Sequence, residues 1–279
     1  MGILNVTPDS FYDKGRFFDS AKAATQGLCL IDEGADILDI GGESSRPGSD
    51  PIPAAEEIRR ILPVLTSLRS QTKALLSIDT TKYETARAAL DAGADIINDI
   101  SAFSLDPRLL ALAAASEAGF ILMHMQGLPK TMQAEPQYVD VLAEVRAFLA
   151  EKIEIAAAYG IAADSLAVDP GIGFGKRLED NLALLRGLES IAELGHPLLV
   201  GVSRKSFIGK ILEEPPEERL EGSIAAAIMG LVHGAHILRV HDVQATRRAV
   251  QVADAILVGS AAETTPKAQV KAREAAHVR

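Results

Sequence analysis

The sequence predicts an α/β protein, specifically a (β/α)8 TIM barrel in which eight parallel strands alternate with helices. Two observations support this fold. The chain contains eight short apolar runs separated by longer amphipathic stretches, and its length of 279 residues is close to the roughly 250 typical of such a barrel. Most of the runs are continuously apolar, as is typical of strands buried on both faces. They lie at residues 2–6, 36–40, 74–78, 95–100, 120–125, 166–168, 198–202 and 236–240.

A doubly wound open sheet is the competing fold for the same alternation of strands and helices. The barrel is favoured because no glycine-rich nucleotide-binding turn follows the first apolar run. No linker, low-complexity segment or long charge run divides the chain. We therefore expect residues 1–279 to form one domain.

The stretches between the runs have the features of helices. One apolar helix face is formed by side chains at steps of three and four residues, namely Leu142, Val145, Leu149 and Ile153. Several helices are expected to stop at a glycine, which adopts the left-handed conformation of a helix end without strain. These glycines are Gly34, Gly93 and Gly119.

Composition and charge exclude several kinds of partner. The chain has 28 basic and 38 acidic residues and a formal net charge of −10, which disfavours binding to nucleic acid and to anionic membranes. No segment has the run of about 18 apolar residues that spans a membrane, and the start lacks the pattern of a signal peptide. Cys29 is the single cysteine, so we expect no disulfide, a buried structural thiol and a reducing, cytoplasmic compartment.

Polar residues follow every predicted strand, which is where a barrel carries its active site. One such residue by itself is usually a helix cap or a turn former, and we expect this of Thr80, Asp99 and Asp242. Eight consecutive strands that end in polar groups would, however, converge on one mouth. The sequence therefore predicts a functional site at that mouth.

Two groups of these residues indicate ligand chemistry. Asp79, Asn98 and Asp169 combine two carboxylates with an amide, and one carboxylate accepts two neighbouring N–H donors side by side. This group suits a ring edge rich in N–H donors, such as an aminopyrimidine, unless the three side chains simply brace the barrel rim. The second group gathers cations and donors and suits phosphate or pyrophosphate. It consists of Asn5, Arg46, Lys205, Arg239 and His241.

Other motifs do not match their consensus. The segment 171–176 is similar to a P-loop, but Pro170 and Arg177 replace its first glycine and its magnesium-binding hydroxyl. Its glycines are expected to let a ligand approach the backbone closely. The six histidines lack the spacing of metal ligands, so no zinc site is expected.

Eight segments, in order along nearly the whole chain, strongly resemble the dihydropteroate synthase family. They are MGILNVTPDSF (1–11), GGESSRPG (41–48), SIDT (77–80), IINDI (96–100), LMHMQG (122–127), DPGIGFGK (169–176), VSRKS (202–206) and RVHDV (239–243). The resemblance implies a transferase of folate biosynthesis and a sulfonamide target. The family joins 6-hydroxymethyl-7,8-dihydropterin pyrophosphate to p-aminobenzoate, giving 7,8-dihydropteroate and pyrophosphate.

The resemblance also implies roles for individual residues. The pterin ring would lie against Asp79, Asn98, Asp169 and Lys205, and Met123 is also implied in substrate binding. The pyrophosphate would lie near Asn5, Arg46, Arg239 and His241, with Mg²⁺ at Asn5. The p-aminobenzoate would lie near Ser45, Pro47, Phe174, Ser203 and Lys205, under a loop that carries Phe11 and Asp13. The residues implied in catalysis are Lys205, Asp169, Arg239, His241 and Arg46.

Two features depart from the family pattern. Ser45 stands where many members have threonine, which removes a methyl group near p-aminobenzoate. The chain also begins inside the first strand, where relatives usually carry a further segment that covers the bottom of the barrel. The family is commonly a homodimer through late helices; the apolar stretch 224–232 suits that role, although burial within one chain would explain it equally well.

Two rival functions remain open. A barrel methyltransferase that uses a reduced pterin shares the pterin-binding Asp and Asn residues, but it is not expected to carry the segments 45–48 and 203–205 as well. A non-catalytic pterin-binding protein would bind pterin and form no product. The intact segments 5–15 and 41–48 favour an enzyme, because a simple binding protein needs no closing loops.

Overall fold

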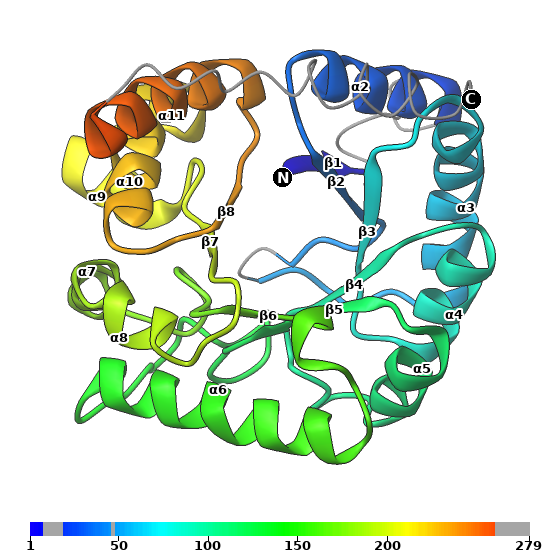
Figure 1. The fold of residues 1–279 in the computed structure, drawn as a ribbon, viewed down its shortest axis with the longest axis horizontal. Coiled ribbons are helices and arrows are strands. Elements are labelled where there is room, and N and C mark those ends of the chain that lie inside the picture. The colour runs from blue at the N-terminus through cyan, green and yellow to red at the C-terminus, as the bar shows by residue number, and fades with distance from the viewer. Residues whose placement is uncertain (8–18, 46–47, 260–279) are drawn as a thin grey trace, which may run out of the picture.

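The computed structural model describes residues 1–7, 19–45 and 48–259, which form a closed ring of parallel strands with helices around the outside (Figure 1). The strands β1 to β6 pair in chain order, and β7 pairs with β8. Parallel bridges from Val168 to Leu198 and from Gly2 to Val240 join these two sheets at both edges and close the ring. The predicted (β/α)8 barrel is confirmed. Its strands are β1 (Gly2–Asn5), β2 (Ile37–Gly41), β3 (Leu75–Asp79), β4 (Ile96–Asp99), β5 (Gly119–Met123), β6 (Leu166–Asp169), β7 (Leu199–Gly201) and β8 (Ile237–Arg239).

Helices connect each strand to the next and cover the outer face of the ring. They are α2 (Ser20–Asp32), α3 (Ala54–Gln71), α4 (Tyr83–Asp91), α5 (Arg108–Ser116), α6 (Val141–Ala158), α7 (Leu178–Arg186), α8 (Leu188–Ala192), α9 (Ser206–Leu212), α10 (Leu220–Val232) and α11 (Val243–Val258), with two short 3-10 turns, η1 (Ala163–Ser165) and η2 (Pro216–Glu218). Val145 and Leu149 on the predicted apolar face of α6 are fully buried. Within the described ranges, no helix is both long and apolar enough to cross a membrane.

Alternate residues of each strand face two different environments. Leu76 and Ile78 of β3 belong to the outer core between strands and helices. Ser77 and Asp79, which alternate with them, bond instead to side chains of β2 and β8 across the inside of the ring. This follows from the period of two in a strand.

The inside of the barrel has an apolar layer below a polar one. The apolar layer is built from Ile121, Ala167 and Leu199, packed against Met1, Ile96 and Ile237. Two positions further along the same strands lie Asn98, Met123, Asp169, Gly201 and Arg239. Because these positions share the inward face with the apolar layer, the strand direction alone brings the polar side chains to the mouth.

Two of the three predicted helix-ending glycines are confirmed. Gly34 and Gly93 have positive φ angles of 104° and 97°. The prediction is wrong for Gly119, which begins β5, because Glu117 takes the left-handed position at the end of α5. A side chain on Gly119 would place its Cβ 3.1 Å from Ile96 inside the barrel. The glycine is therefore explained by packing.

The prediction of a buried thiol at Cys29 is also wrong, because this residue is exposed. The buried positions of α2 are Ala23, Ala24, Gly27 and Leu30, which recur at helical spacing on one face. Residue 29 falls outside that stripe although the surrounding sequence is apolar.

The inner apolar layer provides a test of the fold. Leu199 is fully buried in it, so Leu199→Ala should lower the free energy of unfolding by about 2–5 kcal/mol through the cavity that it leaves. Chemical denaturation measures this. Leu75→Ala is the control, because Leu75 is 46% exposed and should change stability by less than about 1 kcal/mol. Equal effects of the two substitutions would contradict a packed barrel interior.

Candidate active site

The polar layer at the mouth brings together side chains from widely separated parts of the sequence. Asp79 lies opposite Asn98 in the β3–β4 register, and Met123 lies opposite Asp169 in the β5–β6 register. Asn5 lies on the same side: a Cβ on Gly41 would be 3.7 Å from Asp79 Oδ2 and 3.9 Å from Asn5 Oδ1. These polar side chains therefore converge on one mouth of the barrel, as their positions at the strand ends predict.

Arg239 lies between two buried carboxylates inside the barrel. Its Nε donates to Asp39 Oδ2 at 2.6 Å, and its Nη2 donates to Asp79 Oδ2 at 2.9 Å. Burial raises the pKa of Asp79 to about 7, although the Arg239 charge opposes that shift. Burial lowers the pKa of Arg239, but the charges of Asp39 and Asp79 more than compensate and raise it. The guanidinium thus stays charged and ties three strands together.

Asp39 is the residue at this site to which the sequence assigns no role. It is fully buried, accepts a hydrogen bond from Ser77 Oγ at 2.6 Å and accepts another from Asn98 Nδ2 at 3.0 Å. A signal was available in the sequence, because an aspartate interrupts the apolar run Ile37–Gly41. Ionisable residues are seldom fully buried without a partner or a function.

The loop between β6 and α7 is fixed by one buried amine, that of Lys176. Lys176 Nζ donates to Gly171 O and Phe174 O, both at 2.9 Å, and lies 3.0 Å from His124 Nδ1. Burial lowers the pKa of Lys176 to about 7 and that of His124 to about 3. At the start of the loop, Gly171 N donates to Asp169 Oδ1 at 2.7 Å. The amine therefore fixes the segment that carries Asp169.

Two of the three glycines of this loop have a different purpose from the one that the sequence suggests. Gly171 and Gly175 have φ angles of 66° and 60°. A Cβ on Gly171 would lie 1.9 Å from His124 O, and one on Gly175 would lie 2.2 Å from Gln126 O. At these two positions the close approach is made by the end of β5 and the segment after it. For Gly171 and Gly175, the expected approach of a ligand is therefore replaced by packing against this backbone, whereas for Gly173 it stays a prediction.

Lys205 precedes α9 and reaches back to the same loop. Its amine donates to Ile172 O and lies 4.3 Å from the centre of the Phe174 ring. Burial lowers the pKa of Lys205 to about 8, and the Asp169 charge opposes this. Burial likewise raises the pKa of Asp169, against the charge of Lys205. A cation, a carboxylate and an aromatic face therefore share one side of the mouth.

His241 and Ser203 form a second contact at the ends of β7 and β8. His241 Nδ1 lies 3.0 Å from Ser203 Oγ, and the His241 backbone N–H donates to the same oxygen at 3.2 Å. Ser203 is buried, whereas His241 is partly exposed. The imidazole is thus held at the mouth with part of its surface accessible.

The expected turn and cap roles are confirmed for two of three residues. Asp99 accepts from the backbone N–H groups of Ser101 and Phe103, and Thr80 Oγ1 accepts from Lys82 N. Asp242 precedes α11 but makes no side-chain cap. It pairs instead with the guanidinium of Arg204 at 2.7 Å. The cap prediction for Asp242 is therefore wrong, because a charged partner competes for its carboxylate.

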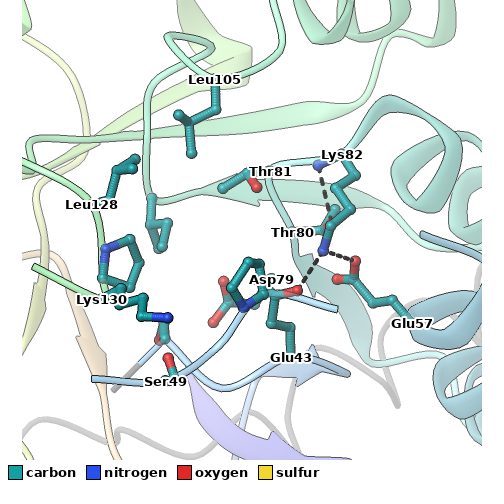
Figure 2. Close-up of a pocket in the computed structure, with 14 residues that line it drawn as sticks. Glu43, Ser49, Glu57, Asp79, Thr80, Thr81, Lys82, Leu105, Leu128 and Lys130 are labelled. Carbon is teal, nitrogen blue, oxygen red and sulfur yellow. Dashed lines mark hydrogen bonds and ion pairs between the residues drawn. The ribbon is translucent and has the colours of Figure 1, made fainter. Parts of the chain in front are cut away.

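A cavity of about 220 Å³ lies beside Asp79 and is lined by Ser45 among others. Figure 2 shows Lys82 at its edge reaching toward Glu43 and Glu57, at 2.6 and 2.8 Å from their carboxylates. Of the residues assigned to p-aminobenzoate, Phe174, Ser203 and Lys205 do not line this cavity. Phe11, Asp13, Arg46 and Pro47 lie outside the described residues.

Comparisons with known proteins identify the family of this chain. The family described as pterin binding enzyme matches residues 1–241. A dihydropteroate synthase from Synechocystis is 48% identical and one from Escherichia coli is 46% identical, each over 92% of this chain and 89% and 91% of their own lengths.

The chain belongs to the pterin-binding enzyme family, among the dihydropteroate synthases.

Solved structures agree with this assignment. The Yersinia pestis dihydropteroate synthase in a sulfonamide complex has a TM-score of 0.87 at 42% identity, covering 92% of this chain and 93% of that one. The Xanthomonas albilineans dihydropteroate synthase with 4-aminobenzoic acid has a TM-score of 0.86 at 47% identity, covering 92% of both chains. Another structure of the Xanthomonas enzyme contains 7,8-dihydropteroate, with a TM-score of 0.83 at 45% identity and the same coverage.

The buried amine of Lys176 yields a prediction. Lys176→Met keeps the apolar stem but leaves the carbonyls of Gly171 and Phe174 without their donor, so the free energy of unfolding should fall by about 2 kcal/mol or more. Denaturant titration measures this. Lys73→Met is the control, because Lys73 is exposed and should change stability by less than about 0.5 kcal/mol. A Lys176→Met variant as stable as this control would show that the amine does not stabilise the loop.

Proposed function

We propose that the polar mouth of this barrel is where the chain joins 6-hydroxymethyl-7,8-dihydropterin pyrophosphate to p-aminobenzoate, releasing pyrophosphate and forming 7,8-dihydropteroate. The observation that carries this proposal is the gathering of Asp79, Asn98, Asp169 and Lys205 at one mouth. The relatives act on or bind related compounds: the Xanthomonas structures contain 4-aminobenzoic acid and 7,8-dihydropteroate.

The pterin ring is assigned to the carboxylate and amide side of the mouth. Asp79 and Asp169 are acceptors held by buried surroundings, and Asn98 adds an amide between them. The donor-rich edge of an aminopterin matches such acceptors, since a carboxylate takes two N–H donors at once. Met123, 3% exposed beside Asp169, supplies apolar surface to the ring.

The p-aminobenzoate is assigned to the side of the mouth where Lys205 lies over Phe174. An aromatic ring and a cation suit a small aromatic carboxylate. Ser203, together with Ser45 and Pro47 from the loop after β2, completes this proposed subsite. In this arrangement Lys205 lies between the proposed sites of the pterin and of p-aminobenzoate.

The pyrophosphate is assigned to Asn5, Arg46, Arg239 and His241. For Mg²⁺, the amide oxygen of Asn5 is a fitting ligand, because this hard cation prefers oxygen donors and keeps several waters. Within the described ranges, no group of three or more His, Cys, Asp or Glu residues could hold a metal, so further ligands would be water and phosphate oxygens. When bound, Mg²⁺ would neutralise charge on the leaving group.

The reaction replaces pyrophosphate on a methylene carbon with an aromatic amine. Because that methylene is attached to an electron-rich pterin, positive charge can develop there as pyrophosphate departs. The carboxylates of Asp79 and Asp169 would stabilise this charge, and His241 and Arg239 would stabilise the leaving group. Lys205 and the loop expected to lie over p-aminobenzoate would hold the amino group of this substrate within about 3–3.5 Å of the methylene carbon. The residues implied in catalysis are thus Lys205, Asp169, Arg239, His241 and Arg46.

The direct test of this function is a coupled assay for pyrophosphate with p-aminobenzoate present and then omitted. Release should require both substrates. Lys205→Ala and Asp169→Ala should each lower turnover roughly 10- to 150-fold, the effect of one charge-assisted contact of about 1.5–3 kcal/mol. Lys210→Ala, at an exposed lysine of α9, is the control. A pterin-dependent methyltransferase or a pterin-binding protein without activity would release no pyrophosphate.

The pKa shifts predict a narrow pH optimum. Asp79 gains a proton below about pH 7 and Lys205 loses one above about pH 8. Both groups are therefore charged only between these values, and kcat/KM should fall on either side. Lys205→Arg should move the alkaline limb upward, because a guanidinium stays charged. An alkaline limb that Lys205→Arg leaves unmoved would assign it to another group.

We also propose that the protein is a cytoplasmic homodimer formed through α10 and α11. These helices pack together and expose several apolar side chains, namely Met229, Val232, Val252 and Ile256. Large exposed apolar patches mark interaction sites. Light scattering after size exclusion should give twice the chain mass, and Ile256→Asp should give the monomer. Val139→Asp, at a fully exposed valine outside these helices, should leave the mass doubled. A wild-type monomer would exclude this dimer.

A further inference from the structure

We propose that Asp39 is a positioning residue that sets the orientation of the Asn98 amide and the Arg239 guanidinium for the pterin substrate. The inference deepens the proposed function and rests on it. Asp39 lies on β2 and Asn98 lies on β4, so β3 separates the two residues. One oxygen of Asp39 nevertheless contacts both Asn98 and Arg239.

The bonds of Asp39 use both carboxylate oxygens. Oδ1 accepts from Ser77 Oγ at 2.6 Å, whereas Oδ2 accepts from Asn98 Nδ2 at 3.0 Å and from Arg239 Nε at 2.6 Å. Asp39 and Ser77 are 0% exposed and Asn98 is 3% exposed. These bonds are therefore sheltered from competing water, and losing one leaves a buried polar group without its partner.

For Asn98, the bond to Asp39 decides which half of the amide meets the ligand. Its Nδ2 is held by Asp39, so its oxygen is the atom left for a ring edge. An amide oxygen accepts N–H donors, as the neighbouring carboxylate of Asp79 also does. Without Asp39 the amide is free to turn and present its NH₂ group, which would oppose the donors of the pterin.

For Arg239, Asp39 supplies the second of two fixed contacts. The guanidinium is held through Nε by Asp39 and through Nη2 by Asp79. If the pterin takes over an oxygen of Asp79, the Asp39 contact still holds the guanidinium inside the barrel. A planar guanidinium held at one edge keeps its orientation, whereas an ammonium would not.

Calorimetric titration with 6-hydroxymethyl-7,8-dihydropterin pyrophosphate, together with steady-state kinetics, tests the proposal. Asp39→Ala should weaken pterin binding at least about tenfold while the KM for p-aminobenzoate changes less than about threefold. Asp39→Asn should recover most of the pterin affinity, because its amide oxygen can accept from Asn98 while its NH₂ group donates to Ser77. Ser77→Ala removes one Asp39 partner, leaves Asn98 and Arg239 in place, and should bind pterin nearly as the wild type does.

A double-mutant cycle separates positioning from a merely structural role. If Asp39 acts through Asn98, Asp39→Ala should have a smaller effect on pterin affinity in an Asn98→Ala background than in the wild type. Additive effects, or pterin affinity unchanged in both Asp39 variants, would overturn the proposal. If Asp39→Ala does not fold, Asp39→Ser replaces it in the titration and in the cycle, because its short side chain also lacks the carboxylate, and the same outcomes decide. A wild-type protein that forms no dihydropteroate would refute the proposed function instead, while the titration would still measure the role of Asp39 in binding.

Discussion

The contact of Arg239 with Asp39 and Asp79 is the interaction on which the mouth of this barrel depends. It joins the last strand, β8, to β2 and β3 across the interior. A single unpaired charge at this depth would be strongly unfavourable, whereas one guanidinium between two carboxylates is largely neutralised. The same contact holds Asp79 in place at the polar end of the barrel. The apolar layer below fills the other end with side chains such as Leu199 and Ile121.

The buried amine of Lys176 plays the corresponding part on the opposite side of the mouth. It gathers backbone carbonyls of the β6–α7 loop around one buried amine. The loop has left-handed glycines at positions where side chains would strike that backbone. The glycines and the packing therefore hold this loop in one backbone conformation. That conformation positions Asp169 before any ligand binds. Rigid support of this kind is what a site needs for orientation to contribute to rate.

Much of this could be predicted from the sequence, and the rest could not for identifiable reasons. Eight apolar runs that alternate with amphipathic stretches were enough for the fold, and the direction of parallel strands was enough to place Asp79, Asn98 and Asp169 together. Asp39 was missed because its importance comes from partners far along the chain, the most distant being Arg239. Asp242 and Gly119 were misjudged because tertiary contacts, an arginine in one case and Ile96 in the other, overrode local rules for helix ends.

The exposed position of Cys29 has a consequence for experiments on this protein. It is the only cysteine in the sequence, and it lies on the outer helix layer, in α2, the first helix described after β1. A thiol-specific fluorophore or spin label would therefore attach at one defined point without any prior removal of native cysteines. Because the stripe that packs α2 on the barrel runs through Ala24 and Leu30 instead, such a label would report on the outer layer while leaving the polar mouth chemically untouched.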